Sequence, residues 1–262
     1  MRTFLYSCAA LVLLFAFSAI SFAGENAHFK FIGFSKDGKY LAFEEYGTYD
    51  GNGAYFSSTY FVDTVNNSYA LPPVEIVEGD TYTAAEKRVE AARNKKLRLT
   101  LANNLRRLKI VESNTGDLLV SHLLTDFSSE NPDETLDENT EKIKFNNFVY
   151  VNSNEQSHYE MILKNVPATG DERCRDINDA FKLELTLEFK MDYQKLEPQI
   201  LQKDTILPER RRCPFGYRIE RVYFYEDKIA VFLNYFYQGF EGRSMRYMVV
   251  TAQMDYEPIN ID

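Results

Sequence analysis

The stretch Phe181-Lys182-Leu183-Glu184-Leu185-Thr186-Leu187-Glu188-Phe189-Lys190 decides the fold class. Every second side chain in it is apolar, and the side chains between are polar or charged. Successive side chains of a β-strand point to opposite faces, so this period predicts a strand with one face buried and the other in water. A strand of this kind needs a second layer to cover its apolar face, and the fold is therefore expected to be built from packed sheets.

Further strand signals lie on both sides of this stretch. The turn Lys36-Asp37-Gly38-Lys39 joins two short apolar runs, which is typical of a β-hairpin because glycine accepts the positive φ of such a turn. A second hairpin is expected from residues 108–113 and 118–124. The predicted fold class is mainly β, with antiparallel strands in a sandwich-like or incomplete propeller-like architecture. Strands are expected near 29–34, 40–43, 59–65, 108–113, 118–124, 143–151, 159–164, 181–190, 217–226, 228–237 and 245–254.

One segment changes its apolar period from two to about 3.6 residues, which predicts a long helix over 84–107. Thr83 and Glu86 have the spacing of a capping box. The polar positions are mainly Lys and Arg, although the whole chain carries a formal net charge of −9. The favoured interpretation is a helix packed against the sheet with its cationic face in water. The alternative is a helix that lies on a membrane surface.

The N-terminus has the pattern of a secretory signal peptide. Residues 1–23 combine Arg2, an apolar run over 4–20 and small residues at positions 21 and 23. We expect cleavage near Ala23, which leaves residues 24–262 as a single secreted or periplasmic β-rich domain; the alternative is a retained membrane anchor. No later apolar run approaches the roughly 20 residues needed to cross a bilayer, so an integral membrane protein is not expected.

Cleavage would also remove Cys8 and leave Cys174 and Cys213 as the two remaining cysteines. An even number of cysteines in an exported chain predicts a disulfide, because compartments outside the cytosol are oxidising. We therefore expect a disulfide bond between Cys174 and Cys213. The alternative is two separate free thiols.

Searches for catalytic motifs give no candidate. His28, His122 and His158 stand apart from one another and from the cysteines, so a zinc site is not expected. Residues 33–37 lack the second glycine of a nucleophile elbow, and no glycine-rich phosphate loop is present. Neither catalytic residues nor a cofactor is predicted. With 39 acidic against 30 basic side chains and no basic stripe, nucleic acid is not an expected partner.

Two segments are candidates for an interaction surface. Arg210, Arg211 and Arg212 form a run that could hold an anion, although the same run is typical of an exposed loop. Gly239, Phe240, Glu241 and Gly242 form the second segment, in which two glycines flank an apolar and an acidic residue between aromatic strands. The alternative for this second segment is a plain β-turn.

Several motifs together resemble the bacterial predicted-secreted-protein family of unknown function. They are Phe31-Ile32-Gly33-Phe34-Ser35-Lys36-Asp37-Gly38-Lys39-Tyr40-Leu41-Ala42-Phe43-Glu44-Glu45-Tyr46-Gly47, Leu207-Pro208, Cys213-Pro214-Phe215-Gly216-Tyr217-Arg218-Ile219 and Gly239-Phe240-Glu241-Gly242. The first motif is also similar to the strand–turn–strand of WD40-like propeller repeats in periplasmic proteins associated with the Tol system. The resemblance implies an exported protein and assigns no catalytic residue.

These observations favour an exported envelope protein that acts as a non-catalytic binding or scaffolding module, with an envelope protein or ligand as its partner. The alternative is an envelope hydrolase or carbohydrate-active enzyme whose carboxylates, Glu44 and Glu241 among them, meet only in the folded chain. The sequence indicates neither the identity of the ligand nor the oligomeric state.

Overall fold

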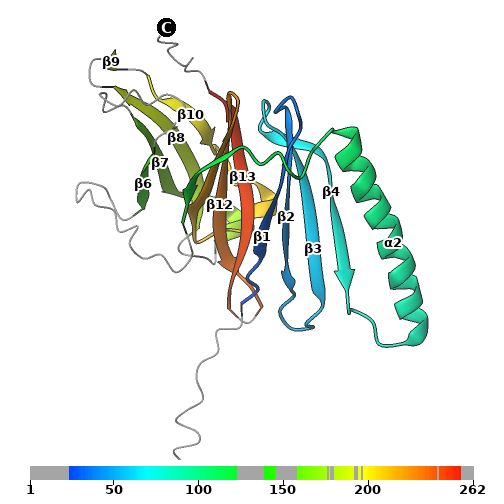
Figure 1. Ribbon diagram of the computed structural model, residues 1–262. Helices are drawn as coiled ribbons and strands as arrows, with labels where there is room; N and C mark the ends of the chain where they lie inside the picture. The colour runs from blue at the N-terminus through cyan, green and yellow to red at the C-terminus, as the bar shows by residue number, and fades with distance from the viewer. Residues whose placement is uncertain are drawn as a thin grey trace, which may run out of the picture.

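The computed structural model describes residues 24–122, 139–145 and 158–254, apart from 176, 178, 179, 192, 193, 196 and 241. Within these residues, three antiparallel sheets stack side by side, and a long helix lies outside the first of them (Figure 1). The predicted mainly β fold is confirmed, and the stacked sheets make it a sandwich. The expected signal peptide, residues 1–23, lies outside the described residues.

The first sheet contains four strands, each paired with the next along the chain. Its first turn is the predicted one: Gly38 has φ +63°, and the Asp37 carboxylate accepts hydrogen bonds from the Ser35 hydroxyl at 2.6 Å and the Lys39 N–H at 3.3 Å. The hairpin read from the sequence is therefore confirmed. The strands are β1 (His28–Phe34), β2 (Tyr40–Thr48), β3 (Tyr55–Asp63) and β4 (Ser68–Glu78).

Strand β4 is an addition to the predicted strands. Pro72 and Pro73 lie inside it and hide the strand signal, because proline cannot donate to a ladder. The register of β3 and β4 shifts between the Thr59–Val74 and Phe61–Leu71 pairs, so neither proline has to donate to the ladder.

The central sheet has the order β13-β12-β11-β5. Strand β5 pairs with β11, about a hundred residues further on, so the expected hairpin between 108–113 and 118–124 is wrong. Leu108 is instead the C-cap residue of the long helix and is buried against the first sheet, and Ile110 makes an isolated bridge with Ser35. The strands are β5 (Asp117–Ser121), β11 (Gly216–Tyr225), β12 (Lys228–Gln238) and β13 (Arg243–Gln253).

The third sheet lies on the other side of the central one and has the order β10-β8-β7-β6, with the short β9 paired to β8. The strictly alternating stretch over residues 181–190 forms β8, in which Leu183, Leu185 and Leu187 are almost fully buried. The strands are β6 (Thr140–Phe145), β7 (His158–Pro167), β8 (Phe181–Met191), β9 (Gln194–Lys195) and β10 (Gln199–Lys203).

The central sheet is covered on both faces. On one face, Val231 and Leu233 pack with the leucines of β7 and β8; on the other, Phe232 packs with Phe43 of β2. This two-sided burial explains why β12 is apolar almost without alternation, whereas β8 alternates strictly. The two interfaces hold the three sheets together.

The helix α2 (Ala84–Arg107) has the predicted bounds. Its N-cap Thr83 accepts a hydrogen bond from the Glu86 N–H at 3.2 Å, and the Glu86 carboxylate accepts one from the Thr83 N–H at 2.8 Å, so the capping box is confirmed. Leucines in its second half pack on the outer face of the first sheet, against Ala42 and Phe61. The predicted packing of the helix on a sheet is thus confirmed. None of the helices in the described part of the chain has the length and apolar character to span a membrane.

Candidate functional site

A cleft of about 700 Å³ lies where the three sheets meet. We call it the junction cleft. The first sheet contributes Tyr60 and Tyr69, the central sheet contributes Tyr235, and the segment after β10 contributes Arg210. Clefts of this volume are typical of small-molecule sites. The walls of the cleft come from all three sheets, so the site forms only when the three sheets are packed together.

The back of the junction cleft is the free edge of β13. Among the described strands β13 pairs with β12 alone, and on its outer side Met245 makes an isolated bridge with Asn26, so the outward N–H groups beyond Met245 need other acceptors. The Glu45 carboxylate accepts from the Tyr247 N–H at 3.1 Å, and the Asn67 side-chain oxygen accepts from the Thr251 N–H at 2.9 Å. The N–H of Val249 points the same way by strand alternation, and Val249 lines the cleft.

Glu45 is the buried centre of this edge, with 3% of its surface exposed. Its carboxylate also accepts from the Tyr60 hydroxyl at 2.6 Å and from Arg246 at 3.3 Å. Burial raises the pKa of Glu45 despite these donors. The carboxylate joins the first sheet to the open edge of the central one, and it holds the Tyr60 ring against the cleft.

The cleft tyrosines remain protonated over the physiological range. Burial, followed by the negative charge of Glu45, raises the pKa of the Tyr60 and Tyr235 hydroxyls. A protonated phenol offers a flat apolar ring and a hydrogen-bond donor together. The site therefore suits a ligand with a flat apolar part and hydrogen-bond acceptors.

The arginine run from 210 to 212 fans out to three different aromatic rings. Arg210 is exposed and lies 5.8 Å from the ring centre of Tyr69, Arg211 lies 5.7 Å from that of Tyr217, and Arg212 lies 5.2 Å from that of Tyr237. Arg210 and Arg211 line the junction cleft. The three guanidinium groups are thus spread apart, rather than gathered around one anion.

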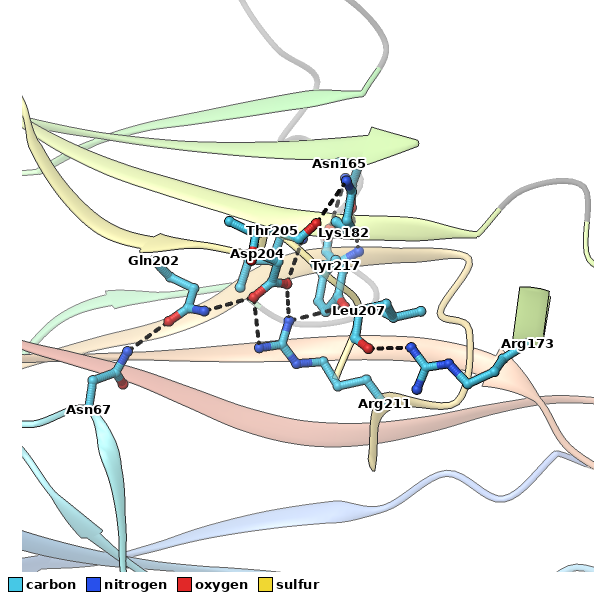
Figure 2. Close-up of polar contacts among 11 residues, drawn as sticks. Asn67, Asn165, Arg173, Lys182, Gln202, Asp204, Thr205, Leu207, Arg211 and Tyr217 are labelled. Carbon is cyan, nitrogen blue, oxygen red and sulfur yellow. Dashed lines mark hydrogen bonds and ion pairs between the residues drawn. The ribbon is translucent and has the colours of Figure 1, made fainter. Parts of the chain in front are cut away.

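A chain of polar contacts fixes Arg211 in place (Figure 2). Its guanidinium forms an ion pair with Asp204, which also accepts from Gln202 at 2.7 Å. Gln202 in turn accepts from the Asn67 amide at 2.9 Å, so the network runs from the first sheet to the third. Because Asp204 neutralises Arg211, Arg210 is the cation of the run that can face a ligand.

The predicted disulfide is present between Cys174 and Cys213, both of which are buried. The bond spans a sequence separation of 39 and ties the residue directly after Arg212 to the short 3-10 helix η2 (Glu172–Cys174). Arg173 of this helix also donates to the Leu207 carbonyl (Figure 2). The arginine segment is therefore held at both ends.

The second predicted interaction segment is the turn between β12 and β13. The Gly239 N–H donates to the Gly242 carbonyl at 2.7 Å, and Phe240 is 84% exposed. Glu241 lies outside the described residues. The turn does not line the junction cleft, and neither does the preceding Tyr237, whose ring lies 5.2 Å from the Arg212 guanidinium.

Of the two carboxylates considered for hydrolysis, Glu44 does not line the junction cleft, and Glu241 lies outside the described residues. Glu44 points to the outer face of the first sheet and accepts from the Ser57 hydroxyl, whereas the adjacent Glu45 faces the interior. No cluster of three or more metal-ligating side chains occurs among the described residues. Tyr60, Tyr69, Tyr235 and Glu45 were not identified as site residues from the sequence. They come from strands far apart in the chain, and only the arginine run carried a local signal.

The disulfide, the stacked antiparallel sheets and the junction cleft define a class: a disulfide-bonded β-sandwich of the kind found among exported proteins. The family model described as "Predicted secreted protein (DUF2259)" matches residues 42–253. The chain belongs to this family, as the resemblance implied. No curated protein and no solved structure matched it.

Proposed function

We propose that this protein is an exported binding protein of the bacterial envelope, which loses residues 1–23 by cleavage near Ala23, acts in the periplasm and binds a ligand in the junction cleft without transforming it. Membership of a predicted secreted family supports export. The buried Cys174–Cys213 bond supports an oxidising compartment.

The observation that carries the proposal is the pairing of Arg210 with exposed tyrosine at the cleft. Tyr69 is 46% exposed and stands beside Arg210, with Tyr60 and Tyr235 in the same walls. Aromatic rings bind flat apolar groups, and an arginine fork binds carboxylate or phosphate. The ligand we propose is therefore a small molecule or chain end that has a flat apolar part and an acidic group.

Native mass spectrometry of the protein purified from its own source tests this function. Ser68 is an exposed residue on the cleft wall, and Ser68→Trp would fill much of the space. Ser113→Trp introduces the same side chain at an exposed position outside the cleft and is the matched control. We expect a small-molecule adduct on the wild type and on Ser113→Trp, and its loss from Ser68→Trp.

An adduct that persists in Ser68→Trp would contradict binding in the junction cleft. Recovery of the adduct in chemically altered form after incubation with the purified protein would contradict the absence of catalysis. The mass of the same native protein reports the removal of residues 1–23, and a retained N-terminus would contradict the proposed export.

A further inference from the structure

The exposed side chains of α2 form a dense cationic surface. The helix carries eight basic side chains and two acidic ones, and all eight basic side chains are exposed. The eight are Lys87, Arg88, Arg93, Lys95, Lys96, Arg98, Arg106 and Arg107. They lie on a helix of about 36 Å, given a rise of 1.5 Å per residue. Figure 1 shows this helix at the outer edge of the molecule, beside β4 and away from the other two sheets.

The two acidic residues of α2 are occupied by local contacts. Glu86 belongs to the capping box, and Glu90 accepts a hydrogen bond from the Gly79 N–H at 3.2 Å. Among the cations, Arg98 forms an ion pair with Glu78, and Arg93 and Arg106 donate to neighbouring oxygens. The remaining five make no ion pair or side-chain hydrogen bond with a described residue. Much of the positive charge of the helix is therefore unneutralised.

Apolar side chains interrupt the cations on this same surface. Val89 is 70% exposed and Leu99 is 60% exposed, although other leucines of the helix pack on the first sheet. One stripe of the helix carries Ala85, Ala92 and Leu99, which follow one another at intervals of seven residues. The apolar face of the helix packs on the first sheet, so its exposed side offers cations and a few apolar side chains, and anionic headgroups attract the cations.

We propose that α2 docks this protein onto a surface of anionic phospholipids. Charge complementarity favours anionic lipid as the partner of the helix. The helix is strongly positive, whereas the whole chain carries a net charge of −9. An anionic surface therefore attracts the helix and repels the rest of the molecule. Docking is therefore oriented, with α2 toward the lipid and the third sheet away from it. Because the apolar stripe is narrow, the attraction is mainly electrostatic and weakens with salt.

Sedimentation with lipid vesicles tests the proposal on the secreted chain. The vesicles contain phosphatidylcholine with phosphatidylglycerol at 3:1, or phosphatidylcholine alone, in 50 or 500 mM NaCl. The helix variant is Arg88→Gln/Lys95→Gln/Lys96→Gln. These three side chains make no ion pair or hydrogen bond with a described residue, and glutamine is also a good helix former. The control variant is Lys30→Gln/Lys36→Gln/Lys164→Gln, which removes the same charge from exposed side chains of β1, the β1–β2 turn and β7 that form no ion pair with a described residue.

We expect the wild type and the control to bind anionic vesicles at low salt and to be released at high salt, with no binding to neutral vesicles. Each cation near an anionic surface changes the partition coefficient about five-fold, so the helix variant should bind roughly a hundred-fold more weakly. Absence of wild-type binding, or equal weakening of both variants, would overturn the proposal. So would a concentration-dependent dimer that the helix variant abolishes, because the occupant would then be a second copy of the chain.

Discussion

Glu45→Gln removes the carboxylate at which the first sheet meets the open edge of β13. Three donors converge on its two oxygens: the Tyr60 hydroxyl, the Arg246 guanidinium and the Tyr247 N–H. A glutamine must place its NH₂ group at one of these oxygen positions, so at least one buried donor loses its acceptor. An unsatisfied buried donor costs about 1–3 kcal/mol, and the weakened pairing of Arg246 adds to it.

We therefore expect Glu45→Gln to lower the free energy of unfolding by about 2–3 kcal/mol at neutral pH. For a chain of this length, that change corresponds to a Tm lower by roughly 5–10 °C in differential scanning calorimetry. Glu44→Gln is the matched control, because the same chemical change on the next residue affects only a contact with Ser57 on the outer face. A Tm for Glu45→Gln within 2 °C of that of Glu44→Gln would refute the role of this carboxylate at the sheet junction.

Two further predictions concern the disulfide and the acid stability. The variant Cys174→Ser/Cys213→Ser should lose about 4 kcal/mol of stability in urea titrations, because the disulfide closes a long loop. Reductant should destabilise the wild type and leave the variant unchanged. An unchanged urea midpoint in the variant would contradict this prediction. Burial opposes ionisation of Glu160, but hydrogen bonds from Lys142 and His158 lower its pKa to about 2. Folding lowers the pKa of Glu160, so the ionised carboxylate stabilises the folded state at pH values above the ordinary carboxyl pKa. This stabilisation is lost as the pH falls from about 4.5 to 2. In pH-dependent calorimetry, Glu160→Gln should be about 1–2 kcal/mol less stable at neutral pH, because solvent screens the exposed partner Lys144, and the difference should disappear as the pH falls to about 2; a constant difference would disprove the assignment.

The sequence predicted correctly those elements whose ends are determined by neighbouring residues. The capping box of Thr83 and Glu86 and the helical period determine both ends of α2, and Gly38 determines the first hairpin. The disulfide between Cys174 and Cys213 forms as predicted, because these are the two cysteines that follow residue 23 and they have one possible bridge between them.

Long-range pairing could not be predicted in the same way. Residues 108–113 have the apolar alternation of a strand, but Leu108 is buried by the helix, and β5 pairs with the distant β11. Alternation shows that a strand has a buried face and does not show which edge it joins. The junction cleft could not be predicted for the same reason, because Tyr60 and Tyr235 become neighbours only where two sheets meet at the edge of β13.

A crystal structure of the protein purified in its native form tests the central claim most directly. We expect density for a small molecule in the junction cleft, with a flat part against Tyr69 and an acidic group at Arg210. A cleft filled only by ordered water, in crystals of protein whose mass includes an adduct, would contradict the proposed binding site.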